Sequence, residues 1–369
     1  MNILILTPDV EHGETADYVY NLSLGLRRNN HVVWVACRKT GQQAAKLSNN
    51  GVSFVSSPQS NSSFSFSTLA AIIALAPIII NRRINIVHGT TKATYFLAFL
   101  LYKLFKIPYV NSFHEFPAGT TFKCPGIIAI AMTNTIKGYL IKEWKTPEKQ
   151  IKVIYQAISA QETVVGPKKN RREFGLRSGS FIASLPVNSS GEEAECMTIE
   201  ALGLIAQTDP NMFLIVPSKR GFQSKLAAIA QKLGFLNNVG FVSIKMPDLL
   251  GLIDILILPQ KNLASAYDYL LASLYGIPVV AFNSGAAAEI ITHKKNGFLF
   301  YSYDSFSLKK TMEEVIAAGQ LRHTAAKNSA SSLSFLAFSQ MVEDTINVYK
   351  SVVSPDDEEE DTTCQENSL

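Results

Sequence analysis

The sequence predicts an α/β fold with two domains of the same class, each built on a parallel sheet wound with helices. Short runs rich in β-branched residues alternate with amphipathic segments of helix length, which is the pattern of strand–helix–strand units. This alternation stops and restarts once, after a stretch of Gly, Pro and basic residues at 160–180. A chain of 369 residues is also too long for one ordinary core, since a domain averages ~150 residues.

The first half of the chain carries strand-like runs from "NILIL" (2–6) to "IKVIY" (151–155). Helices are expected between them at about 15–28, 67–82, 92–105 and 134–144. The apolar run "LAAIIALAPIII" (69–80) contains Pro77. It is shorter than the ~20 residues of a membrane span, so we expect a buried helix there.

The second half carries strand-like runs from "SFIASL" (180–185) to "GFLFY" (297–301) and only helical patterns after about 304. The stretch at 160–180 has the composition of a linker. We therefore expect an N-terminal domain at 1–165, a C-terminal domain at 166–334, a last helix at 335–353, and a disordered acidic tail at 354–369, because such a tail cannot bury enough apolar area to order itself.

Charge and cysteine use narrow the classes of function. The net charge is +4, and removing the seven acids of the tail leaves about +11, which weakly favours anionic surfaces or phosphates. The four cysteines are scattered and form no metal-binding pattern, which fits a reducing cytoplasm. The N-terminus has no basic segment before its short apolar run, so we expect a first strand and no signal peptide.

The sequence disfavours two classes of function, nucleic-acid binding and dehydrogenase activity. Its basic residues are dispersed and are not interleaved with aromatic residues as in a nucleic-acid-binding groove. Neither half carries G-x-G-x-x-G after its first strand, which disfavours a dehydrogenase. We expect no nucleic-acid partner and no cofactor.

The order of the segments resembles that of the retaining glycosyltransferases of family 4 over residues 1–352. The most specific segments are "MPDLLGLIDILILP", "YGIPVVAFNSGAAAEIITHKKNGFLF" and "YDSFSLKKTMEEVI", which occur in the family's order and spacing. The resemblance implies two Rossmann-like domains facing a cleft, the GT-B arrangement. It places the acceptor in the first domain and the nucleotide sugar in the second, with the last helix crossing back to the first.

In the first domain the resemblance points to His114 and Gly13. The family's counterpart of His114 faces the transferred sugar, and a neutral histidine can donate one hydrogen bond to a hydroxyl or a leaving phosphate. A purely structural histidine is the alternative. A glycine at position 13 would let the backbone approach a phosphate, but Glu14 would repel a diphosphate, and an ordinary turn explains the residue equally well.

In the second domain the resemblance implies a donor site that has lost its charges. The family's Arg and Lys, which neutralise the diphosphate without a metal ion, fall at Leu185 and Ser190. Glu192, Glu193 and Glu195 add charge of the opposite sign just beyond them. Lys219 and Arg220 are either substitutes from the next loop or solvated surface charges.

The family's paired glutamates fall at Leu263 and Leu271. Leucine spacing at 263, 270, 271 and 274 predicts one amphipathic helix with both former ligand positions on its buried face. In "SGAAAEII" the sequence retains Ser284, Gly285 and Glu289. The family counterpart of Glu289 ends a Gly-rich turn near the donor, and helix capping is the alternative.

Two hypotheses for function follow. The first is transfer of a sugar, with retention, from a nucleotide-sugar donor to a glycan or lipid-linked acceptor. The second is a catalytically impaired homologue that acts as a scaffold or regulatory subunit of an active glycosyltransferase. The apolar segment 95–109 ends in Lys103 and Lys106. It suggests peripheral contact with the inner membrane face of a cytoplasmic protein, or else a helix packed on the sheet.

Overall fold

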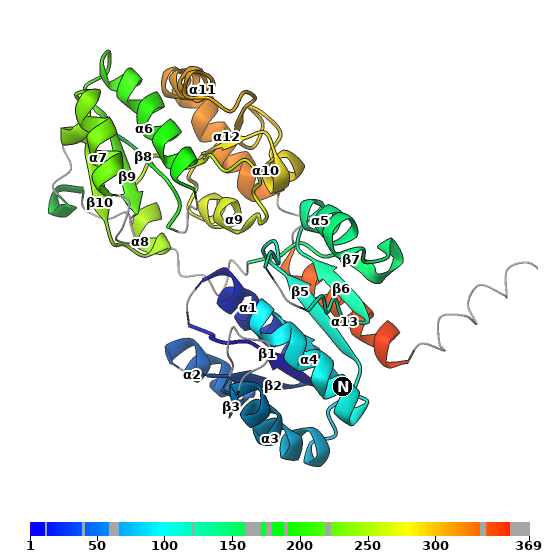
Figure 1. Cartoon of the computed structure of the whole chain (residues 1–369). Helices are drawn as coiled ribbons and strands as arrows, with labels where there is room; N and C mark the ends of the chain where they lie inside the picture. Colours follow the sequence, from blue (N-terminus) through cyan, green and yellow to red (C-terminus); the bar gives the residue numbers. More distant parts are fainter. Residues whose placement is uncertain are drawn as a thin grey trace, which may run out of the picture. The chain divides into compact units, whose positions relative to one another are not determined.

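The structure of the chain is a computed structural model (Figure 1). The structure describes residues 1–11, 13–38, 41–58, 66–119, 122–158, 171–174, 179–187, 191–217, 223–332 and 337–354. The chain forms two compact units, Met1–Ser159 with Leu336–Leu369, and Ala160–Phe335. The expected domain boundary near 165 and the acidic tail from 355 onward lie outside the described residues.

The first unit contains a parallel sheet in the strand order β3-β2-β1-β4-β5-β6-β7. Its strands are β1 (Asn2–Leu6), β2 (Val32–Cys37), β3 (Ser53–Ser56), β4 (Ile86–Gly89), β5 (Tyr109–Phe113), β6 (Ile128–Ala131) and β7 (Ile151–Val153). Its helices are α1 (Glu14–Arg28), α2 (Gln42–Asn49), α3 (Phe66–Asn81), α4 (Lys92–Phe105), α5 (Asn134–Trp144), the 3-10 turn η1 (Glu148–Gln150) and α13 (Phe338–Val353).

The second unit contains a parallel sheet in the order β10-β9-β8-β11-β12-β13. Its strands are β8 (Phe181–Ser184), β9 (Met212–Pro217), β10 (Val239–Val242), β11 (Ile255–Leu258), β12 (Val279–Phe282) and β13 (Phe298–Phe300). Its helices are α6 (Glu192–Ala206), α7 (Gln223–Lys232), α8 (Met246–Leu250), α9 (Tyr267–Leu274), α10 (Gly285–Ile290), α11 (Ser305–Ala317) and α12 (Gly319–Ser332), with 3-10 turns η2 (Arg171–Phe174) and η3 (Leu236–Asn238).

Both sheets have the doubly wound strand order, which confirms the prediction of two Rossmann-like units. In each sheet the order reverses beside the first strand, between β1 and β4 in one unit and between β8 and β11 in the other. Ligands of such sheets bind at the carboxyl ends of the strands around this reversal. The carboxyl edges are therefore the first places to look for a site.

The sequence analysis missed two helices, α2 and α12. Both are polar, and α2 is short, with only Ala44 and Leu47 buried. In α12, Ala325 and Ala326 are buried. Helices that bury so few apolar side chains carry little of the periodicity on which a sequence-based prediction depends.

The prediction that 69–80 forms a buried helix was half wrong. The helix exists as α3, but only Ala71, Leu75 and Ile79 are buried in it. These three pack in a cluster that includes Leu97 and Leu101 of α4. The opposite face of α3 is also apolar. It is exposed because the core covers only one face of the helix.

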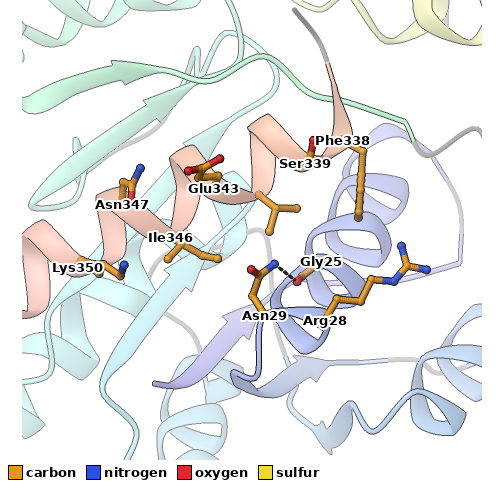
Figure 2. A pocket seen from close by; sticks show the side chains of 10 residues that line it. Gly25, Arg28, Asn29, Phe338, Ser339, Glu343, Ile346, Asn347 and Lys350 are labelled. Atoms are coloured by element: carbon orange, nitrogen blue, oxygen red, sulfur yellow. Dashed lines mark hydrogen bonds between the residues drawn. The ribbon is translucent and has the colours of Figure 1, made fainter. Parts of the chain in front are cut away.

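The last helix, α13, packs against α1 in the first unit, as the crossing prediction required. The close approach depends on Gly25, since a Cβ there would lie 2.2 Å from Val342 Cγ2. Beside this contact the two helices leave a groove lined by Arg28, Asn29, Glu343 and Lys350, among others (Figure 2). Asn29, which lines the groove, donates a hydrogen bond of 2.9 Å to Gly25 O.

Candidate functional site

His114 lies directly after β5, at the carboxyl edge of the first sheet, and is only 4% exposed. Its Nδ1 lies 3.3 Å from Gln156 Oε1 and 3.7 Å from Glu14 Oε1. Its Nε2 lies 3.3 Å from Ser112 Oγ. The strand ends and the start of α1 thus bring three polar side chains to one imidazole.

One tautomer of His114 satisfies all of these contacts together. Gln156 Nε2 donates to Glu14 O over 3.2 Å, so the amide oxygen of Gln156 faces the imidazole and accepts from Nδ1. Nε2 then carries a lone pair and accepts from the Ser112 hydroxyl. In this tautomer the N–H at Nδ1 points to Gln156, and Nε2 faces the hydroxyl of Ser112.

Tyr18 and His88 form the buried layer beneath His114. The Tyr18 ring meets His114 edge to face, with centroids 4.5 Å apart. Burial, with a smaller contribution from His114, lowers the pKa of His88 from 6.5 to about 3. His88 is therefore neutral and forms part of the buried structure in β4.

Gly13 precedes α1 in the left-handed region, at φ 93°, and a Cβ there would meet no atom within 4 Å. The turn is open, and α1 starts with Glu14 and has Asp17 in its first turn. Acidic side chains at a helix N-terminus already complement the positive end of the helix dipole. This end of α1 is thus less suited to a diphosphate than a glycine-rich turn without carboxylates.

In the second unit Leu185 directly follows β8 and is 0% exposed. It belongs to the core cluster that contains Leu214 and Ile257. The position that the resemblance assigns to a donor-binding cation therefore points into the core. Ser190, Lys219 and Arg220 lie outside the described residues.

The glutamates at the start of α6 are paired with lysines. Glu192 forms an ion pair with Lys225, and Glu193 Oε1 lies 2.8 Å from Lys261 Nζ. Lys261 Nζ also lies 4.2 Å from the centroid of the Tyr303 ring, within the range of a cation–π interaction. Negative charge at this edge is therefore partly neutralised from within the unit.

Lys261 is a candidate site residue that the sequence analysis missed. It follows β11 by three residues, beside the reversal of strand order. Tyr303, which follows β13, packs edge to face on Phe282 at the end of β12, with centroids 5.0 Å apart. A lysine just after the buried run "DILILP" was the available signal, because strand ends at this edge place side chains where a ligand binds.

Leu263 does not lie on the helix that the leucine spacing predicted. It lies in the loop before α9, which starts at Tyr267, whereas Leu271 lies on α9 and is 4% exposed. Ser265 Oγ accepts a hydrogen bond of 3.0 Å from Tyr267 N and marks the start of the helix. The leucine spacing continues from Leu263 into α9, but the helical backbone begins only at Tyr267.

The loop at Leu263 is tied to the start of α10. Ala286 N donates to Leu263 O over 2.7 Å. Gly285 has φ 57°, and a Cβ there would lie 2.4 Å from the same oxygen. Gly285 is thus required for this close approach, with Ser284 just before it.

Glu289 is half-buried and is the fifth of the six residues of α10. Glu289 does not cap α10 itself, because a carboxylate stabilises the opposite end of a helix. Among the residues that the structure describes, no His, Cys, Asp and Glu side chains lie together as metal ligands would. None of the described helices combines the length and the hydropathy of a membrane span.

Comparison with protein families identifies each unit separately. Residues 15–162 match the model described as Glycosyltransferase Family 4, and residues 197–332 match the model described as Glycosyl transferases group 1. Among curated proteins, an uncharacterized glycosyltransferase of Methanocaldococcus jannaschii is 23% identical over 296 residues, which are 72% of this chain and 75% of that protein.

Solved structures of the same fold cover nearly the whole chain. A glycosyltransferase from Rickettsia africae has a TM-score of 0.78 at 17% identity, covering 96% of this chain and 98% of its own. Anabaena HepE in complex with UDP and glucose has a TM-score of 0.76 at 19% identity, covering 95% and 100%. With both units matched in the expected order, the chain belongs to the family 4 glycosyltransferases of the GT-B fold.

Proposed function

We propose that this chain is a catalytically impaired glycosyltransferase homologue that binds a nucleotide sugar weakly and serves an active glycosyltransferase as a scaffold or regulatory subunit. The burial of Leu271 and Leu185, which are 4% and 0% exposed, supports this proposal most directly. The family's donor-binding carboxylate and cation would stand at these two positions. A leucine forms neither an ion pair nor a hydrogen bond, and a core position is closed to a ligand.

The expected loss of donor affinity is large. A hydrogen bond to a charged group contributes ~1.5–3 kcal/mol, so loss of the two glutamates removes ~3–6 kcal/mol. This corresponds to ~10²- to 10⁴-fold in affinity. Loss of the cations weighs further on turnover, because charge grows on the leaving diphosphate in the transition state.

The second candidate is an active enzyme that transfers a sugar with retention to a glycan or lipid-linked acceptor. The arrangement around His114 favours it. Ser112, Gln156 and Glu14 surround the imidazole at a carboxyl edge, and together they offer donors and acceptors for sugar hydroxyls. Lys261, together with Lys219 and Arg220, would then have to balance the diphosphate.

The test is titration calorimetry of the full chain with uridine, guanosine and adenosine diphosphate sugars, together with an assay for released nucleotide. Uridine diphosphate glucose comes first, because HepE was solved with it. Release is measured with and without a lipid extract as acceptor, and His114→Ala is the control. The impaired homologue should show ~millimolar dissociation constants and release no faster than the His114→Ala variant. Micromolar binding with acceptor-dependent release that His114→Ala abolishes would establish the active enzyme instead.

A further inference from the structure

The groove between α1 and α13 lies away from the carboxyl edge of the first sheet. Glu14, beside His114, and Arg28, which lines the groove, are the first and last of the 15 residues of α1. At a rise of ~1.5 Å per residue the two ends of this helix lie ~21 Å apart. The residues that line the groove belong to the first unit. Its volume is about 530 Å³, within the range of small-molecule sites.

The floor of the groove is apolar. Val342 and Ile346 of α13 line it and are 1% and 7% exposed. Gly25 of α1 lines it as well, and a Cβ at this position would lie 2.2 Å from Val342 Cγ2. The floor therefore suits a ligand that presents C–H groups on one face.

Exposed polar side chains border this floor on the α13 side. They recur every three or four residues and so share one face of the helix; they are Ser339, Glu343, Asn347 and Lys350. Figure 2 shows the last three along α13, with Asn29 on α1. Glu343 only accepts hydrogen bonds when ionised, Lys350 only donates, and Asn347 does both. This mixture suits hydroxyl groups, which also donate and accept.

The two ends of the groove are positive. At one end Arg28 Cζ lies 5.8 Å from the centroid of the Phe338 ring, which is a cation–π distance. Lys350 stands at the other end, ~18 Å from Phe338 along α13. Burial, the N-terminal ammonium and Lys350, in this order, lower the pKa of His31. Glu343 is the one carboxylate among the lining residues, so the groove carries an excess of positive charge.

We propose that this groove binds a small sugar that carries an anionic group, a sugar phosphate or a sugar acid. The C–H face of the ring packs on Val342 and Ile346, and the hydroxyls bond to Glu343 and Asn347. The anionic group pairs with Arg28, because a guanidinium binds a carboxylate or a phosphate through two parallel hydrogen bonds. Glu343 disfavours a ligand that offers charge alone, since it repels an anion. Binding here does not involve the carboxyl edge or the second unit, so it is independent of the function proposed above.

The test is saturation-transfer NMR of the full chain with hexose phosphates, hexuronates, their neutral parent sugars and inorganic phosphate. Titration calorimetry then gives the dissociation constant of each ligand that binds. We expect the anionic form of a sugar to bind ~10-fold or more tightly than its neutral parent, because a charge-assisted hydrogen bond adds to the hydroxyl contacts. Inorganic phosphate should bind more weakly than the sugar phosphate, since it lacks those contacts. The relative affinities of phosphates and uronates show which anionic group the groove prefers.

Arg28→Gln should remove most of the preference for the anionic form and leave the affinity for the neutral parent sugar nearly unchanged. The matched control is Arg322→Gln in the second unit, because Arg322 Cζ also lies over a phenylalanine ring, that of Phe181, at 4.8 Å. This control should keep the full preference. If Arg28→Gln keeps it too, the anionic group does not lie in this groove and the proposal is overturned.

Asn347→Ala combined with Lys350→Gln should weaken the binding of each sugar ~10-fold or more. Asn49→Ala with Lys46→Gln makes the same two changes, at the same spacing and at exposed positions of α2, and should bind as the wild type does. Both variants should keep the melting temperature of the wild type, because all four side chains are exposed. Failure of the wild type to bind any sugar of the panel would overturn the proposal. So would full binding by the Asn347 variant together with loss of binding in His114→Ala, which would place the sugar at the carboxyl edge.

Discussion

His88 Nδ1 and Tyr349 OH lie 2.6 Å apart in a buried hydrogen bond that joins β4 of the first sheet to α13. The two residues are separated by 261 positions in the chain. Burial raises the pKa of Tyr349 and lowers that of His88, so both partners are neutral. The bond therefore fastens the returning helix to the sheet without a buried charge.

Replacing Tyr349 with Phe should destabilise the first unit by ~1–3 kcal/mol, because His88 Nδ1 would remain buried without a partner. Urea unfolding measures the loss. Tyr139→Phe on α5 is the control, since its half-buried ring lies where water can replace a lost partner. Equal free energies of unfolding for the two variants would show that the hydrogen bond between His88 and Tyr349 does not stabilise the folded chain.

Stability should also fall on acidification because of His88. The folded chain keeps His88 neutral down to about pH 3, whereas in the unfolded chain the pKa returns to about 6.5. Between these values the unfolded state binds more protons, so the free energy of unfolding decreases as pH falls, by at most ~1.4 kcal/mol per pH unit from this group. The difference in unfolding free energy between the wild type and His88→Gln should therefore shrink as the pH falls from about 6.5 to about 3. The exposed His323→Gln variant should instead follow the wild type at a constant offset.

Gly25→Ala should loosen the packing of α13 on α1. The new methyl group would lie 2.2 Å from Val342 Cγ2 and 2.9 Å from Cγ1, so either the helices separate or Val342 moves, at a cost of ~1–3 kcal/mol. Gly138→Ala is the matched control, because it is also within a helix but has open space around the Cβ position. It should stabilise the chain by ~0.5–1 kcal/mol. Thermal unfolding measures the melting temperature of both variants. If the two melting temperatures shift in the same direction, this explanation of Gly25 is wrong.

The sequence predicted the strands well because each is a short β-branched run bounded by turn residues, and a strand in a parallel sheet is buried on both faces. It failed at α3, since apolar content alone does not tell which face the sheet covers. It failed at Leu263 because a local hydrogen bond to Ser265 sets the start of α9. The contact between Lys261 and Tyr303 joins loops 42 positions apart, and no local pattern encodes such a contact.

Leu271→Glu should destabilise the second unit and fail to restore donor binding. Leu271 is almost fully buried, and an unpaired carboxylate there costs several kcal/mol or stays protonated through a raised pKa. Leu263→Glu makes the same change in a half-buried loop and should be tolerated with a much smaller loss. Urea unfolding and donor titration of each variant check this. Donor-dependent nucleotide release by a stable Leu271→Glu variant would show that the position still opens to a ligand.

Glu193→Gln should raise the affinity for uridine diphosphate. In the wild type Lys261 Nζ is held by Glu193 at 2.8 Å and by the Tyr303 ring at 4.2 Å, so a diphosphate must compete with a carboxylate for this cation. The glutamine removes that competitor and a like charge at the start of α6, and we expect ~3- to 10-fold tighter binding.

Lys261→Gln should weaken binding ~10-fold in either background, because a charge-assisted hydrogen bond is lost. Glu313→Gln, which breaks the exposed pair with Lys309 at 2.6 Å on α11, is the control and should change nothing. Titration calorimetry with uridine diphosphate at low salt gives the five affinities, those of the wild type, the three single variants and the double variant. If Glu193→Gln and Lys261→Gln both bind as the wild type does, the donor phosphates do not lie at this edge of the second sheet.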